Sequence, residues 1–176
     1  DDHYVGRCAA LDDVTIRSRV GGDLDEIHFR DGQMVEQGDV LFTIDERPFR
    51  AELDEAEART RTAEATLDFA QAQLDRGRDL VGRGTIAQAL FDEREQALLG
   101  AQAQFDAAMA SRARAQLNLD FSTITAPIAG RIDRNFVSTG NLITADGTEL
   151  TSIVSLDPIE YYFDIDERAL IYYSRA

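Results

Sequence analysis

The sequence contains no lysine and no tryptophan, one cysteine and three prolines among its 176 residues. Without a lysine amine, neither Schiff-base catalysis nor covalent attachment of a carried group such as lipoate or biotin is possible. Because Cys8 stands alone, no disulfide can form within the chain. These absences exclude lysine-dependent enzymes, carrier modules and disulfide scaffolds.

Basic side chains are outnumbered by acidic ones, 18 to 33, which leaves a formal net charge of −15. A phosphate backbone needs a basic face, so this balance excludes nucleic acid as a partner. The sequence has neither the roughly 18–20 consecutive apolar residues of a membrane span nor a signal peptide. It begins within strand-like text, which we interpret as the start of a mature or trimmed fragment.

Residues that could bind a metal are scattered along the sequence. His3 and His28 are isolated, Cys8 is the only thiol, and Met34 and Met109 lie in different segments. A metal site needs clustered nitrogen, sulfur or carboxylate ligands. No nucleophile stands beside a base, and no glycine-rich loop leads from a strand into a helix. We therefore expect no enzymatic activity, no cofactor and no metal.

A short β-like phrase occurs twice. Residues 18–32 read SRVGGDLDEIHFRDG and residues 126–140 read APIAGRIDRNFVSTG. Gly22 and Gly32 in the first copy have the same ten-residue spacing as Gly130 and Gly140 in the second. Apolar residues align at the same offset, and one such half alone would expose strand edges and a single apolar face. We predict that half-motifs 14–46 and 120–156 form one sandwich, with these glycines at equivalent turns.

Residues 47–119 change to a helical period. Pro48 suits a first helical turn, and Asp45 or Glu46 can cap it. Apolar or small residues then recur with alternating steps of four and three for more than four repeats. The predicted seam includes Phe49, Leu53, Leu67 and Leu74 on the first arm, and Phe91, Leu98 and Phe105 on the second, where Arg94 and Arg112 interrupt it.

Two glycines mark a turn at about residues 82–87, and the second arm begins near residue 88. Arms of similar length joined by a short turn predict an antiparallel coiled-coil hairpin. The segment carries 12 acids and 10 arginines, a mixture that fits packing against other helices and a solvated face equally well. The expected fold class is α+β, a sandwich with this hairpin inserted between its halves.

The two ends have no counterpart in the sandwich. Residues 1–13 read as a strand stub, and residues 157–176 as a fresh strand followed by a helix-like start. We interpret both as parts of a third module.

Three phrases together resemble a known family: RSRVGGDLDEIHFRDGQMVEQGDVLFTID, LNLDFSTITAPIAGRIDRNFVSTGNLI and SIVSLDPIEYYFDIDERAL. The duplicated half-motif resembles the lipoyl/biotinyl carrier domain. With the inserted hairpin, nearly the whole chain is similar to periplasmic adaptors, or membrane fusion proteins, of bacterial tripartite efflux pumps. The last phrase is similar to the opening of the β-barrel in the branch that works with resistance-nodulation-division (RND) pumps.

The resemblance implies a non-enzymatic, hexameric adaptor in the periplasm, attached to the inner membrane through a segment outside this chain. Its hairpin tip is expected to meet an outer-membrane channel, while its barrel side grips an inner-membrane efflux transporter that exports drugs or other small molecules. The alternative is an adaptor of an ATP-driven exporter or secretion system with the same hairpin. The barrel-like end favours the adaptor of an efflux transporter over this alternative.

The family's tip carries an arginine, a leucine four residues later and a serine seven residues beyond that. The matching positions here are Arg76, Leu80 and Ala87, so alanine replaces the serine. Thr85 is the candidate for the capping role that the serine would have. The expected channel contact comprises Arg76, Leu80, Arg83, Gly84, Thr85, Ile86 and Ala87.

Overall fold

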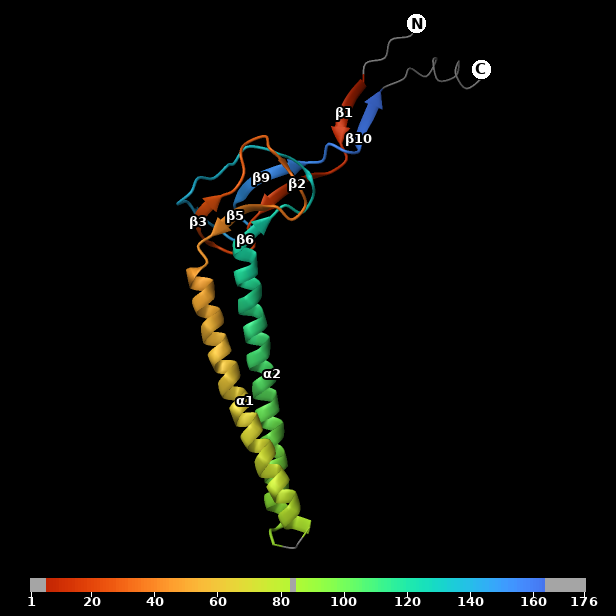
Figure 1. Cartoon of the computed structure of the whole chain (residues 1–176). Helices are drawn as coiled ribbons and strands as arrows, with labels where there is room; N and C mark the ends of the chain where they lie inside the picture. Colours follow the sequence, from red (N-terminus) through yellow and green to blue (C-terminus); the bar gives the residue numbers. More distant parts are fainter. Residues whose placement is uncertain (1–5, 83–84, 164–176) are drawn as a thin grey trace, which may run out of the picture. The chain divides into compact units, whose positions relative to one another are not determined.

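The computed structural model describes residues 6–82 and 85–163 (Figure 1). The chain divides into two compact units. One contains residues up to Ile44 and from Thr123 onward, and the other contains Asp45–Ser122. The hairpin unit is therefore an insertion within the sequence of the β unit.

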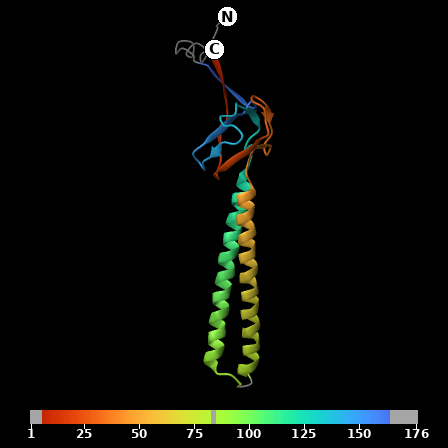
Figure 2. The same cartoon turned by 90° about the vertical axis from the view of Figure 1, so that its left-hand side faces the viewer.

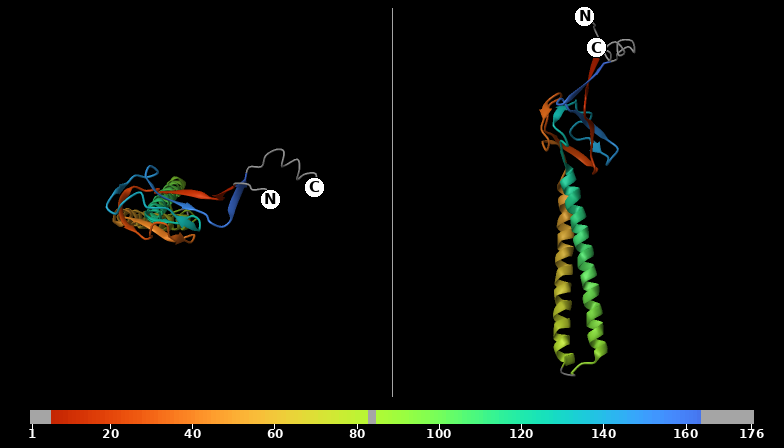
Figure 3. Two further views of the ribbon diagram at one scale, coloured as in Figure 1. Left: turned by 90° about the horizontal axis from the view of Figure 1, so that it is seen from above. Right: turned by 90° about the vertical axis from the view of Figure 1, so that its right-hand side faces the viewer.

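The β unit contains two four-stranded sheets, which Figure 3 shows from two further directions. Strands of the first half of the chain, red to orange, lie among strands of the second half, teal to blue. One sheet has the order β2-β9-β7-β4 and the other the order β6-β5-β3-β8. The strands are β2 (Asp13–Arg17), β3 (Gly22–Ile27), β4 (Met34–Val35), β5 (Val40–Ile44), β6 (Thr123–Thr125), β7 (Gly130–Ile132), β8 (Leu142–Ile143) and β9 (Glu149–Val154).

The two sheets are related by the duplication in the sequence. Exchanging β2 with β6, β3 with β7, β4 with β8 and β5 with β9 converts one strand order into the other. The register repeats as well: Gly22 pairs with Ile143, and their counterparts Gly130 and Val35 pair with each other. The predicted fold class is confirmed, because neither half forms a sheet without strands of the other.

Alternating strand residues fill the space between the sheets. Phe42 is fully buried, and its ring meets the ring of Phe29 edge to face at a centroid distance of 5.2 Å. The other large side chains that are less than 2% exposed are Leu24, Leu41, Ile44, Ile132, Ile143, Leu150 and Ile153. Both halves therefore contribute to one apolar core.

Glycine conformations repeat between the halves. Gly32 has a φ of 75° and Gly140 a φ of 86°, values that residues with a side chain rarely adopt. Gly22 and Gly130 lie against the neighbouring strand: an added Cβ would be 2.7 Å from Ile44 Cγ2 at Gly22 and 2.4 Å from the Val154 carbonyl oxygen at Gly130. The first pair permits the turns, and the second permits close approach of the strands.

The hairpin unit consists of α1 (Arg47–Gly82) and α2 (Gln88–Ser122), which run side by side in Figure 2. The second helix is longer than the sequence pattern indicated, because it ends at Ser122 rather than near Leu119. The Ser122 hydroxyl donates to the carbonyl oxygen of Leu119 at 2.6 Å, which satisfies one of the last backbone acceptors of the helix. The second half-motif accordingly begins at Thr123.

A separate two-stranded antiparallel sheet joins the two ends of the β unit. It pairs β1 (Gly6–Ala10) with β10 (Ile159–Phe163), with Cys8 opposite Tyr161. The predicted helix-like start after this strand lies outside the described residues.

Candidate functional site

The candidate site is the helical hairpin, in which α1 and α2 meet along a seam. The positions that follow the alternating steps of four and three along α1 are all buried or half-buried: Phe49, Leu53, Ala56, Thr60, Ala63, Leu67, Ala70, Leu74, Gly77 and Val81. Leu74 is 5% exposed, while Phe49, Leu53 and Leu67 are half-buried. On α2, Phe91, Leu98 and Phe105 are half-buried. The seam is thus narrow, and small side chains at many of its positions let the two backbones approach.

Arg94 fits into the seam because a glycine faces it. Its guanidinium donates to the carbonyl oxygen of Gln73 on α1 at 3.1 Å. It also lies over Gly77, where an added Cβ would be 2.9 Å from Arg94 Nη1 and 3.5 Å from the ring of Phe91. The glycine of one helix therefore makes room for the arginine of the other.

Two further polar contacts join the helices nearer their base. Arg112 pairs with Glu57 at 3.2 Å, so this arginine is an ion-pair partner rather than a seam residue and stays largely exposed. The Thr60 hydroxyl donates to the carbonyl of Ala56 in its own helix at 2.9 Å and approaches the carbonyl of Ala108 at 3.4 Å. These contacts set the register between α1 and α2.

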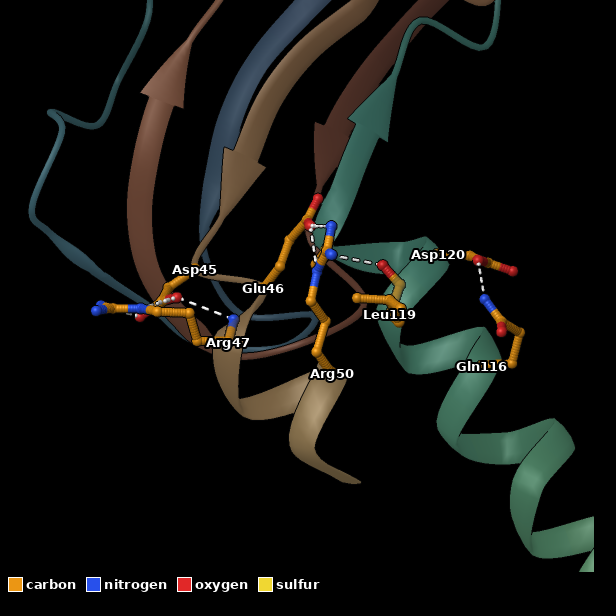
Figure 4. A network of polar contacts seen from close by, with 8 residues as sticks. Asp45, Glu46, Arg47, Arg50, Gln116, Leu119 and Asp120 are labelled. Carbon is orange, nitrogen blue, oxygen red and sulfur yellow. Dashed lines mark hydrogen bonds and ion pairs between the residues drawn. The ribbon is translucent and has the colours of Figure 1, made fainter. Parts of the chain in front are cut away.

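The start of α1 is held by acidic side chains, as Figure 4 shows. Asp45 accepts hydrogen bonds from the backbone N–H of Arg47 at 3.0 Å and from its guanidinium at 2.7 and 2.8 Å. The Arg47 side chain and then its backbone N–H lower the pKa of Asp45 from the usual 3.8 to about 2. Glu46 pairs with Arg50 at 2.7 Å, so both predicted capping residues contact the first helical turn.

At the opposite end of the hairpin, the described tip residues present a mixed surface. Arg76, Thr85 and Ala87 are exposed, while Leu80 and Ile86 are half-buried. The backbone N–H of Thr85 donates to the carbonyl of Leu80 at 2.9 Å and so helps to end α1. Arg83 and Gly84 lie outside the described residues.

The capping role expected for Thr85 was wrong. Leu90 donates its backbone N–H to the carbonyl of Ala87 at 3.1 Å, which places Ala87 at the N-cap of α2. Within the described residues, no hydrogen bond joins the Thr85 hydroxyl to α2. The sequence pattern missed this because the capping position is defined by the backbone of the turn.

Sequence reasoning also missed an aromatic residue on the outside of the hairpin. Phe69 is 62% exposed at mid-length of α1. The sequence carried a signal for this exposure. Phe69 follows the seam residue Leu67 by two positions, and two residues turn a helix by about 200°, away from the seam.

The described part of the chain has neither a cluster of metal ligands nor a membrane-spanning helix. No group of three His, Cys, Asp or Glu side chains in it could hold a metal ion. None of its helices combines the length and apolar character needed to cross a membrane. The features left to explain are the hairpin surfaces and the tip.

Comparison with known proteins gives matches over almost the whole chain. The family described as RND MFP, barrel-sandwich hybrid domain, matches residues 12–155. Multidrug resistance protein MdtA of Pectobacterium carotovorum is 39% identical over 164 residues, which cover 93% of this chain and 40% of that protein. MdtA of Proteus mirabilis is 35% identical over 167 residues, covering 94% and 41%. The chain thus spans about two-fifths of the curated relatives that it matches.

Solved structures share the fold at lower identity. The membrane fusion protein Spr0693 of Streptococcus pneumoniae has a TM-score of 0.68 at 21% identity, covering 95% of this chain and 72% of that one. A putative efflux transporter of Bacteroides eggerthii has a TM-score of 0.61 at 20% identity, covering 98% and 50%. The fold of this chain, a sandwich with an inserted hairpin, is therefore shared by these two solved structures.

Proposed function

Because this chain belongs to the RND membrane fusion proteins, through their barrel-sandwich hybrid domain, we propose that it bridges an inner-membrane efflux transporter and an outer-membrane channel. It acts as a non-enzymatic adaptor in the periplasm, attached to the inner membrane by a segment outside these residues. Its relatives MdtA are multidrug resistance proteins, so the proposed cargo is drugs or other small molecules. The match to an RND family favours this function over an adaptor of an ATP-driven exporter.

The observation that carries the proposal is the hairpin inside the family match. Its helices of 36 and 35 residues extend for about 50 Å at 1.5 Å per residue. A hairpin of this length places its tip far from its base and provides a rigid support for docking. The β1–β10 sheet is the proposed start of the barrel on the transporter side.

In this proposal, the tip residues meet helices of the channel. Arg76 offers several fixed N–H donors for carbonyl or carboxylate groups, and Leu80 fills a groove between helices. Ile86 and the turn residues Arg83, Gly84, Thr85 and Ala87 complete the contact. Since several copies dock together, six in the hexamer that the family implies, weak contacts are multiplied by avidity.

The test is drug accumulation in cells that express Leu80→Asp. A buried anchor of this kind typically contributes about 2 kcal/mol or more, and the added charge opposes docking at every copy. We expect efflux to be lost while the protein level and binding to the inner-membrane transporter remain normal.

Met109→Asp is the matched control, because it places the same charge on an exposed position of the same hairpin away from the tip. It should leave efflux intact. Normal efflux with Leu80→Asp at normal abundance would refute tip docking and leave the hairpin as a spacer.

A further inference from the structure

Gly77 lies inside α1, shortly before that helix ends at Gly82. Glycine in a helix interior is less stable than alanine, so its presence calls for a physical reason. The residue is buried, and an added Cβ would be 2.9 Å from Arg94 Nη1 and 3.2 Å from Arg94 Cδ. The side chain that α1 lacks in this layer of the seam is thus replaced by the arginine side chain of α2.

Arg94 spans two levels of α1. Side chains of a helix lean toward its N-terminus, which in α2 is the direction of the hairpin tip. The stem of Arg94 lies beside Gly77, and its guanidinium donates to the carbonyl oxygen of Gln73 at 3.1 Å. Gln73 and Gly77 are four residues apart, about one helical turn. One side chain of α2 therefore contacts α1 at two points along its axis.

The arginine is an expensive residue for this position. It is half-buried, and no acidic side chain within residues 6–82 and 85–163 forms an ion pair with it. Removing a cation from water is costly, so a leucine would fill an ordinary seam layer at lower cost. What arginine adds is a charge-assisted, directional hydrogen bond to the backbone of the opposite helix. Such a bond fixes the height of α1 as well as its spacing from α2.

This contact lies directly below the tip. Arg76 stands between Gln73 and Gly77 in the sequence, and Leu80 follows Gly77 by less than one turn. Because Arg76 and Leu80 are four residues apart, they lie on one face of α1. The direction of that face depends on the rotation of α1 about its axis, which the two contacts of Arg94 fix. Of the polar contacts described above between α1 and α2, this one is nearest the tip.

We propose that Arg94 is a positioning residue for channel docking: it holds α1 so that Arg76 and Leu80 meet the outer-membrane channel at one height and one rotation. It acts through Gln73 and Gly77 and lies outside the expected channel contact. Without the arginine, the glycine leaves a layer of the seam unfilled, and the last turns of α1 can rotate or tilt. The inference rests on the proposed function and adds a residue that controls the geometry of the tip.

The first test measures this geometry in the full-length protein, with every free thiol, Cys8 included, replaced by serine. Nitroxide pairs are placed at exposed positions, near the tip at Asp79→Cys with Asp92→Cys and near the base at Glu52→Cys with Arg114→Cys. Double electron–electron resonance gives the distribution of distances within each pair. Arg94→Ala should broaden and shift the distribution of the tip pair and leave that of the base pair unchanged. An unchanged tip distribution would overturn the proposal.

The second test exchanges the sizes of the two seam residues. Adding Gly77→Leu to Arg94→Ala refills the layer from α1 as an ordinary seam residue. The tip distribution and efflux should then return part of the way to those of the parent protein, because spacing is restored without the hydrogen bond.

Gly100→Leu in the same Arg94→Ala background is the matched control. It also removes a glycine from the interior of a hairpin helix, but an added Cβ there would meet no atom within 4 Å. It should restore neither the tip distribution nor efflux. Equal rescue by Gly77→Leu and Gly100→Leu would mean that helix stability alone is at issue, and would overturn the positioning role.

Drug accumulation measures the consequence for efflux. A small loss at each docked copy is multiplied across the assembly, so Arg94→Ala should lower the efflux rate about tenfold at normal protein level. Arg94→Met keeps the stem and loses the donor, whereas Arg94→Lys keeps a stem with a charged donor at its end. Efflux should therefore be higher with Arg94→Lys than with Arg94→Met, and lowest with Arg94→Ala. Equal efflux for the lysine and methionine variants would contradict the role of the hydrogen bond.

The outcomes keep the two proposals distinct. Efflux that is lost with Leu80→Asp but normal with Arg94→Ala removes positioning by Arg94 and leaves tip docking standing. Normal efflux with Leu80→Asp refutes tip docking whatever Arg94→Ala does, and the label distances then show whether Arg94 still fixes the geometry of the hairpin.

Discussion

The sandwich and the hairpin bury different kinds of side chains. In the sandwich, large residues are fully enclosed between the sheets, including Leu41, Phe42, Ile44, Leu150 and Ile153. In the described part of the hairpin, the buried apolar residues are Ala56, Ala70, Leu74, Ala101 and Ala115, of which only Leu74 is large. Since apolar burial supplies most of the stability, the sandwich is stabilised by a compact core and the hairpin by a thin seam.

Exposed apolar side chains occur in both regions. The sandwich exposes Met34 at 59% and Leu142 at 71%. A two-helix seam buries one side of each helix and leaves the other sides available, as exposed Phe69 and Leu99 show. The contrast therefore lies in the interior: the sandwich encloses large side chains completely, and the described hairpin buries mostly small ones.

The largest expected effect is in the sandwich core. Phe42→Ala removes a fully buried ring and its edge-to-face contact with Phe29, and should lower the free energy of unfolding by about 4 kcal/mol. Hydrogen exchange of strands β3 and β5 measures it. Phe69→Ala is the control, since that ring is exposed, and should cost the isolated chain under about 0.5 kcal/mol. Similar losses for both would contradict the contrast between the regions.

The hairpin seam should respond more locally. Leu74→Ala deletes the large side chain that is buried in the seam among the residues described, and should cost about 2–3 kcal/mol. Because the seam contacts are mainly between neighbouring turns, faster hydrogen exchange is expected around residue 74 and toward the tip, with the β strands unchanged. Leu99→Ala, at an exposed position of α2, is the matched control. Loss of protection throughout the chain would mean that the two regions unfold together.

The paired glycines give a smaller and sharper comparison. Gly130→Ala would place a Cβ 2.4 Å from a backbone oxygen of Val154, whereas Gly22→Ala would meet only the side chain of Ile44. We expect Gly130→Ala to cost about 2–3 kcal/mol and Gly22→Ala clearly less, because a methyl group can move and a paired strand cannot. Denaturant unfolding of the two variants measures this. Equal costs would show that both sites relax alike.

Much of this fold follows from patterns along the chain. Apolar residues and glycines that recur at one offset predicted the duplicated sandwich, because strand pairing at that offset brings Gly22 and Gly130 to equivalent places. The alternating steps of four and three predicted the hairpin, since that spacing puts apolar residues on one side of a helix.

Features that depend on the opposing helix could not be predicted. Arg94 interrupts the seam when α2 is considered alone, and Gly77 looks like a weak point when α1 is considered alone. Only the pairing of the two shows that one accommodates the other. The assignments at the tip come from the resemblance to the adaptor family and stay predictions.

A stabilising substitution should be possible at the tip. Ala87 occupies the N-cap of α2 but has no side-chain acceptor for the N–H groups of the first helical turn. Ala87→Ser should therefore stabilise the start of α2 by about 1 kcal/mol, measured by hydrogen exchange of residues 88–91. Thr85→Ser is the control and should change nothing there. Equal protection in Ala87→Ser and the parent chain would mean that the turn already satisfies those groups.

The smallest expected effect is electrostatic and lies at the base of the hairpin. In the folded chain the pKa of Asp45 is lowered from 3.8 to about 2, first by hydrogen bonds from the Arg47 side chain and then by its backbone N–H. A carboxyl whose pKa is lower in the folded state stabilises that state above its unfolded pKa. This contribution is present above about pH 4 and is lost as the pH falls toward 2.

A carboxyl-carbon NMR titration should give a midpoint near 2 for Asp45, and Arg47→Ala should move it toward 3.8. Because Arg47 is largely exposed, added salt should reduce the difference, and a midpoint that is the same with and without Arg47 would show that the pair exerts no electrostatic effect in solution.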